Sequence, residues 1–129
     1  MALDERLRTE DIAWITTVTA DGQPQSSPVW FLWDDGEFLV YAQPHSWKVR
    51  NIRANPRVSL HLNSDREGGQ IATFEGSARI SEGHPPAHEA DAYLAKYRQR
   101  IAGIGMTPER LSAEYSTALR ITPTRIRVY

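Results

Sequence analysis

A chain of 129 residues with a formal net charge of −1 can bury its own core without disulfides or a structural metal, so we expect a single domain over residues 1–129. The near-neutral charge argues against a general nucleic-acid-binding protein, which would be strongly basic. The chain has no cysteine, so disulfide bonds and thiolate metal sites are both excluded.

The N-terminal segment is too polar for a secretory signal. Residues 1–14 carry six charged side chains before the first sustained apolar run. Nowhere does the sequence approach the roughly 18 consecutive apolar residues that would span a bilayer. We therefore expect a cytoplasmic protein, with neither a membrane nor a nucleic acid as its partner.

The first half of the chain predicts short strands divided by tight turns. Its apolar runs are rich in β-branched and aromatic residues, and Asp-Gly turns separate them. The expected elements are a short helix over 3–10 and strands over 13–20, 25–33 and 38–42.

The second half mixes helices with strands. The alternation of Val58, Leu60 and Leu62 is typical of a strand, and Gly76 inside a long apolar run indicates a bulge or a tight bend. The expected elements are helices over 47–54, 84–101 and 107–111, and strands over 57–62, 70–80 and 117–129, the last as one or two strands. Together these elements predict a mainly β fold, a small six-stranded, closed or partly closed barrel with flanking helices.

The strand over 25–33 contains a possible ligand platform. Pro28 is tolerated in a strand only at an edge or a bulge, so it predicts a local interruption of pairing. Trp30 and Phe31 follow it, and because they alternate, one should point inward and the other outward. A planar aromatic ligand would find a stacking face there and unpaired main-chain groups. The alternative is that both aromatic side chains belong to the core.

The segment "HSWKVRNIRANPRV" (45–58) predicts a helix that begins with cations. Ser46 can cap this helix, Lys48 lies in its first turn, and Asn51 lies on the same face as Lys48. The helix dipole disfavours cations at this end, whereas a bound anion would reverse that cost. The alternative is a solvated surface helix with ordinary basic content.

The sequence gives little support for a metal site or for nucleophilic catalysis. His84 and His88 are four residues apart, but the two prolines between them place His84 before the helix, so we expect no metal site. The Asp34-Asp35 pair is explained by its turn. No Gly-x-Ser-x-Gly elbow is present, and we expect no catalytic side chain of the acid–base or nucleophilic kind.

These pieces, taken in order, resemble the pyridoxamine 5′-phosphate oxidase-like flavin and deazaflavin proteins. The resemblance covers about residues 8–82 and rests on the patterns "DGxPxxxPVWF" and "SxKxxNIxxNPRVSL", with "LRITPTRIR" similar to the last strand of the family. More narrowly, the chain resembles the branch that uses the deazaflavin coenzyme F420 instead of FMN.

The resemblance implies a six-stranded split β-barrel of the FMN-binding type and a homodimer with cofactor sites at the subunit interface. It implies that the phosphate end of the cofactor lies by Ser46, Lys48 and Asn51. It places the ring system along Ser27, Pro28, Val29 and Trp30, with Tyr41, Ala42 and Gln43 beneath it.

The activity that the resemblance implies is F420-dependent hydride transfer to a small conjugated or quinone-like acceptor. An FMN-dependent oxidase or reductase of the same fold is the main alternative. A non-catalytic protein that holds F420, a flavin or haem is a third hypothesis, in which His61 or His88 could serve as haem ligands. A cofactor-free structural dimer is the last.

Overall fold

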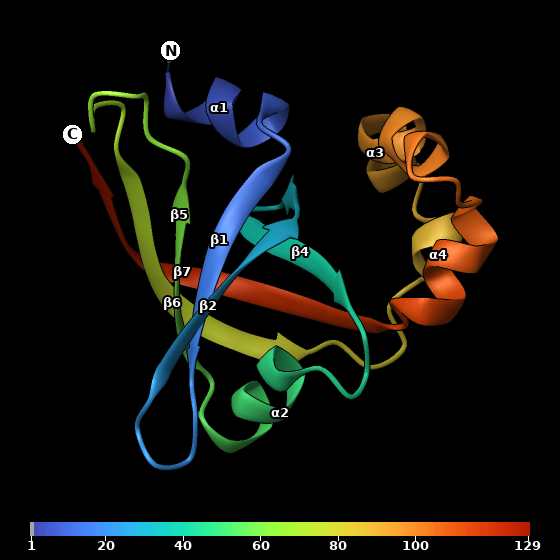
Figure 1. Ribbon diagram of the computed structural model, residues 1–129, viewed down its shortest axis with the longest axis horizontal. Coiled ribbons are helices and arrows are strands. Elements are labelled where there is room, and N and C mark those ends of the chain that lie inside the picture. The colour runs from blue at the N-terminus through green and yellow to red at the C-terminus, as the bar shows by residue number, and fades with distance from the viewer. Residues whose placement is uncertain (1) are drawn as a thin grey trace.

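The computed structural model describes residues 2–129 as one antiparallel sheet that curls into a half-barrel, with helices at its open side and ends (Figure 1). The sheet order is β2-β1-β5-β6-β7-β4-β3. The strands are β1 (Ile12–Val18), β2 (Pro24–Trp30), β3 (Leu32–Asp34), β4 (Glu37–Ala42), β5 (Arg57–Leu62), β6 (Ala72–Ile80) and β7 (Thr117–Val128). The helices are α1 (Leu3–Thr9), α2 (Trp47–Ala54), α3 (Asp91–Gly103) and α4 (Pro108–Glu114), with a 3-10 turn over Ala87–Glu89. The mainly β split barrel is therefore confirmed.

The expected strand count of six is wrong, because the run over 25–33 divides at Phe31 into β2 and β3. The backbone of Phe31 is bonded to α3 at this point. Its N–H donates to the Tyr97 hydroxyl at 2.8 Å, and its carbonyl accepts from the Lys96 ammonium at 2.8 Å. Polar groups that would extend a ladder are taken by side chains of a distant helix, so the strand breaks there.

Pro28 does not interrupt the pairing of β2 with β1. The register runs without a shift from Ile12 opposite Trp30 to Val18 opposite Pro24. β2 lies at the edge of the sheet, which is where a strand tolerates a proline.

The bulge expected at Gly76 is present, where the β6–β7 register shifts between Glu75 and Gly76. A Cβ on Gly76 would lie 2.5 Å from the carbonyl oxygen of Thr122. The glycine therefore allows β7 to cross β6 closely, and β7 continues as one strand instead of two.

The core has two parts, which β4 separates. Phe38 and Val40 point into the barrel, where Phe38 meets Phe74 edge to face at 4.9 Å. Leu39 and Tyr41 point to the other side and pack beneath α3 and α4. Alternation along a strand thus buries both faces of β4.

The helix expected over 47–54 is confirmed as α2, with Ser46 as its N-cap. The helix expected over 84–101 begins later, at Asp91, because Pro85 and Pro86 hold the preceding chain extended and only a 3-10 turn follows them. None of the helices in residues 2–129 is both long and apolar enough to cross a membrane.

Candidate functional site

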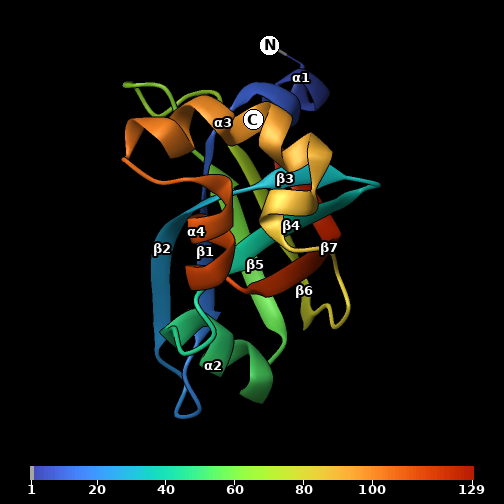
Figure 2. The same ribbon diagram turned by 90° about the vertical axis from the view of Figure 1, so that its right-hand side faces the viewer.

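A cavity of about 270 Å³ lies between the barrel and the helices α3 and α4. The barrel and α2 contribute Pro28, Val29, Trp30, Tyr41, Ala42 and Lys48. The helical segment contributes Tyr93, Ile104, Leu111 and Tyr115. Figure 2 faces this segment and shows α3 and α4 in front of the sheet, with α2 below them. The cavity therefore has one wall of strands and one wall of helices.

Aromatic rings form much of the cavity wall. Tyr41 meets Tyr93 edge to face at 4.9 Å, and Trp30 stacks on Tyr97 behind it, also at 4.9 Å. Burial raises the pKa of Tyr41 to about 12 and raises the pKa of Tyr93 further. These phenols stay protonated at neutral pH, so they offer flat surfaces and neutral hydroxyls to a ligand.

Lys48 provides the positive charge of the cavity. Its side chain is half-buried, and burial lowers the pKa of its ammonium. Within residues 2–129 no carboxylate lies at ion-pair distance from it. A desolvated and unpaired cation is costly, and an anion at this position would offset that cost.

A second cavity of about 240 Å³ shares Lys48 with the first as a lining residue. It is lined by Thr17, Gln25, Ser26, Ser27, Trp47 and Lys48. Four of these side chains carry hydroxyl or amide groups, and we call this second hollow the polar cavity after them. Lys48 thus lies where an aromatic cavity meets a polar one.

The start of α2 borders the polar cavity. The Ser46 hydroxyl oxygen accepts a long hydrogen bond of 3.5 Å from the Val49 N–H, which confirms the expected cap. The first turn contains no acidic side chain. The dipole of α2 therefore remains uncompensated by a carboxylate at the end nearest Lys48.

The sequence matches the pyridoxamine 5′-phosphate oxidase family along its whole length, residues 1–129. The chain belongs to this family. This family membership agrees with the resemblance that the two sequence motifs indicated. It also agrees with the half-barrel fold described above.

Solved structures of the same fold include proteins with different named roles. A conserved hypothetical protein of Mycobacterium tuberculosis is 23% identical with a TM-score of 0.78, covering 100% of this chain and 84% of its own. An F420 reductase is 23% identical with a TM-score of 0.75, covering 98% and 97%. HutZ, the haem storage protein of Vibrio cholerae, is 20% identical with a TM-score of 0.70, covering 98% and 91%. At these sequence identities, the structural similarity establishes a shared fold only.

The structure gathers six of the ten residues expected at a family cofactor site into the aromatic cavity: Pro28, Val29, Trp30, Tyr41, Ala42 and Lys48. Ser27 lines the adjoining polar cavity. Gln43 is exposed and Ser46 half-buried, and neither lines these two cavities.

Asn51 is buried and has a structural task. Its side-chain amide donates to the Thr17 hydroxyl and to the Gln25 side-chain oxygen, both at 2.9 Å. Both amide hydrogens are thereby used to fix α2 against the β1–β2 hairpin. Asn51 lines a third, open hollow of about 410 Å³ beside Trp47 and Arg50, outside the aromatic cavity.

Sequence reasoning missed the helical wall. Tyr93, Ile104, Leu111 and Tyr115 follow the resembling region in sequence, and their distance from Trp30 along the chain hides their contact with it. The helical spacing of Tyr93 and Tyr97 signalled a buried face, but it carried no information on what that face covers.

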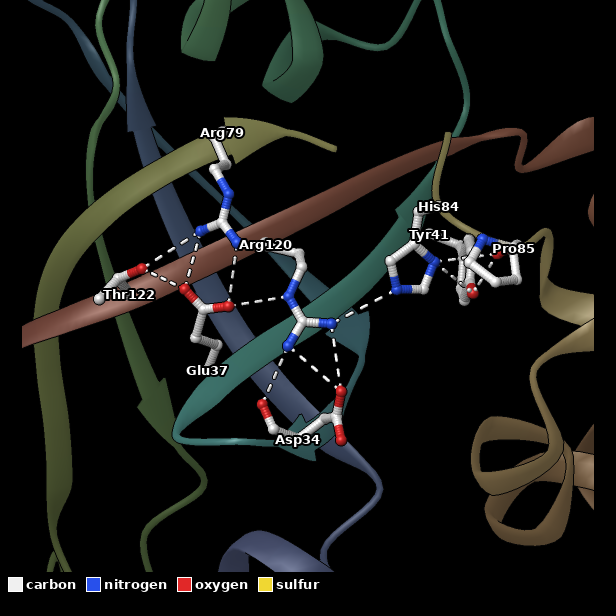
Figure 3. A network of polar contacts seen from close by, with 8 residues as sticks. All are labelled: Asp34, Glu37, Tyr41, Arg79, His84, Pro85, Arg120 and Thr122. Atoms are coloured by element: carbon white, nitrogen blue, oxygen red, sulfur yellow. Dashed lines mark hydrogen bonds and ion pairs between the residues drawn. The ribbon is translucent and has the colours of Figure 1, made fainter. Parts of the chain in front are cut away.

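Behind the cavity, a polar network links β7 to the β3–β4 hairpin (Figure 3). The guanidinium of Arg120 donates to the side chains of Asp34 and Glu37, at 3.2 and 2.8 Å. Hydrogen bonds from Arg79, Thr122 and Arg120 hold the pKa of the Glu37 carboxyl well below its ordinary value. Asp34 therefore holds the β3–β4 hairpin to β7 through Arg120. Asp35 has the positive φ of 52° that a tight turn requires.

Arg120 also reaches toward the cavity through His84. Its guanidinium lies 3.4 Å from the His84 Nε2, and the His84 Nδ1 lies 3.0 Å from the Pro85 carbonyl oxygen (Figure 3). The Tyr41 hydroxyl donates to the same carbonyl at 2.8 Å. His84 therefore supports Tyr41 from behind. In residues 2–129 no three His, Asp or Glu side chains gather as a metal site.

Proposed function

We propose that this protein is an F420-dependent oxidoreductase that transfers a hydride between the reduced deazaflavin and a small conjugated or quinone-like acceptor. The observation that carries the proposal is the position of Lys48. It lies unpaired and half-buried where the aromatic cavity meets the polar one. A ligand with a planar ring and an anionic chain fits both cavities at once.

The aromatic cavity suits the ring system of such a cofactor. Its walls are flat side chains of Trp30, Tyr41 and Tyr93, which favour a planar aromatic partner through stacking and edge contacts. The volume of about 270 Å³ lies near the lower end of ordinary small-molecule pockets, so it suits a ring system and not the whole cofactor. The anionic chain would therefore extend past Lys48.

The polar cavity suits that anionic chain. Lys48 would bind its phosphate, and the hydroxyls of Ser26 and Ser27 lie along the same hollow. Arg50, two residues further along α2, is exposed beside the third hollow and extends the positive charge outward. Bound phosphate would raise the pKa of Lys48 back toward its ordinary value, because the anion favours the charged amine.

The side chains of this protein would position the reactants and exclude water. The cofactor would supply the hydride chemistry. The ionisable groups of the aromatic cavity are Lys48 and three tyrosines, and burial keeps Tyr41 and Tyr93 protonated. An electrostatic anchor and aromatic walls suit a reaction that needs orientation more than proton transfer.

We also propose that the active form is a homodimer. Trp47 is 66% exposed beside the polar cavity, and Ile104 is 57% exposed at the aromatic one. Large apolar side chains at the rims of a binding site favour cover by a second subunit. A second copy would then complete both cavities.

The same fold with FMN remains the main alternative, because Lys48 and the aromatic walls would serve a flavin phosphate and ring equally well. Haem binding has less support. None of the histidines in residues 2–129 lines the aromatic cavity, and His84 already contacts Arg120 and Pro85.

A side-by-side titration with F420 and FMN tests the proposal, with cofactor fluorescence as the readout. Tight binding of F420 and weak binding of FMN would support it and justify a screen of acceptors. The opposite preference would assign the protein to the FMN-dependent alternative. Binding of neither cofactor would contradict the proposal.

A further inference from the structure

Trp30 owes its position to a residue outside the cavity. Its indole ring stacks on the ring of Tyr97 with the centroids 4.9 Å apart and the planes only 4° from parallel. Trp30 lines the cavity, whereas Tyr97 is fully buried behind it on α3. One face of the indole is thus covered by Tyr97, which leaves the other side of the ring for a ligand.

The hydroxyl of Tyr97 fixes this stack to the sheet. It accepts the Phe31 N–H at 2.8 Å and lies 2.7 Å from the Asp11 carbonyl oxygen and 2.8 Å from that of Phe31, either of which can accept its proton. Phe31 directly follows Trp30. The same phenol therefore holds the indole by its ring and the adjoining backbone by its hydroxyl.

Tyr97 also contacts the opposite wall. Its ring lies 4.9 Å from that of Tyr93, which in turn meets Tyr41 at 4.9 Å. Three of these four rings, those of Trp30, Tyr93 and Tyr41, line the cavity, and Tyr97 joins the first two from behind. A shift of Tyr97 would change the distance between the two aromatic walls.

We propose that Tyr97 is the positioning residue of the aromatic cavity: by stacking on Trp30 and bonding to Phe31, it sets the width of the slot that receives a planar ligand. The proposal rests on the proposed function for the identity of that ligand. Its geometry concerns the protein alone and can be tested without any cofactor.

The first test compares Tyr97→Leu, which removes the stack, with Tyr97→Phe, which keeps the ring and removes the hydroxyl. We expect the Kd for F420 to rise about two- to tenfold in the leucine variant, the usual range for an aromatic pair. Lys96→Met is the matched control, because it removes the other side-chain donor to the Phe31 carbonyl without touching Trp30. Its Kd should stay within about twofold of the wild-type value.

Coupling to Trp30 separates positioning from general loosening. In a Trp30→Phe background, Tyr97→Leu should add little to the change in Kd, because the two residues act as one unit. Additive effects of the two substitutions on Kd would overturn the proposal. An equal rise in Kd for Tyr97→Leu and Lys96→Met would also overturn the proposal, since both substitutions would then act through stability alone.

Near-ultraviolet circular dichroism gives a readout that needs no cofactor. The stacked indole and phenol should contribute a signal that Tyr97→Leu removes and that is already absent in Trp30→Phe. If the wild-type protein binds neither F420 nor FMN, the proposed function fails while this measurement still tests the positioning. If Tyr97→Leu does not fold, Tyr97→Met takes its place, because methionine also removes the stacked ring while filling more of its volume. An unchanged aromatic signal in a folded Tyr97→Leu variant would contradict the stack.

Discussion

Lys48 has a cost in the free protein that the proposed anion site would explain. Burial lowers the pKa of its ammonium, which means that the folded state disfavours the charge. A methionine of similar length would keep the packing of the stem and remove that charge. Replacing Lys48 by methionine should therefore raise the free energy of unfolding and lower the affinity for an anionic ligand.

We predict that Lys48→Met raises the free energy of unfolding while weakening cofactor binding by about 1.5–3 kcal/mol, the usual range for a charged hydrogen bond. Urea denaturation and fluorescence titration of the same preparation measure the two effects. Arg53→Ala is the control, because Arg53 is an exposed cation in the last turn of the same helix. An unchanged titration curve for Lys48→Met would remove the anion site from the proposal.

Lys96 gives a prediction on pH. Its ammonium is half-buried against Phe31, and burial lowers its pKa from 10.5 to about 8. Between these two values the unfolded chain holds more protons than the folded one, so this residue makes the free energy of unfolding rise with pH. Comparing wild type with Lys96→Met by denaturation from about pH 7 to about pH 10 isolates the contribution. Above pH 8 the free energy of unfolding of the wild type should rise relative to that of the variant. A difference between the two proteins that does not change with pH would contradict the lowered pKa of Lys96.

At the scale of elements, the crossing of β6 and β7 depends on Gly76. An added Cβ would meet a backbone carbonyl, which cannot rotate away as a side chain could. We predict that Gly76→Ala costs about 1–3 kcal/mol of stability, as overpacking usually does. Thermal unfolding measures it. Gly103→Ala is the matched control: a Cβ there meets no atom within 4 Å, so its stability should stay the same or rise slightly. Equal melting temperatures of the two variants would contradict this account of the bulge.

Local chemistry explains why most elements could be predicted and why some features could not. The cap of α2 at Ser46 and its end at Asn55 each depend on residues that are neighbours in the sequence, as does the turn of each hairpin. Local patterns therefore predict them well. The break at Phe31 depends on Lys96 and Tyr97, far along the chain, and no local pattern indicates it.

The candidate site divides in the same way. Trp30 and Lys48 lie within the family motifs and were predicted. The hydrogen bonds of Asn51 could not be predicted, because its amide meets Thr17 and Gln25 only after α2 has packed against β1 and β2.

For the whole molecule we predict a dimer. Ile126 and Val128 stand opposite Phe74 and Ala72 across the sheet, so they share the core face, yet they are 45% and 57% exposed. A core face left open to water favours cover by a second copy.

Light scattering at micromolar concentration should give twice the mass of one chain. Ile126→Glu should shift the equilibrium toward the monomer, because a buried charge at such a contact is costly. A wild-type protein that is monomeric under these conditions would contradict the prediction.

The place of β7 in the sheet has a consequence for how the chain folds during synthesis. The hairpin of β3 and β4 joins the rest of the sheet only through β7, which follows the other six strands in the sequence. Until then β4 is paired on one side only, with β3, and the loop to be closed is long, which slows folding. Tyr41 and Ala42, and the helices that face them, gain their final places only after β7 is added, so the cavity cannot form before β7 has been synthesised.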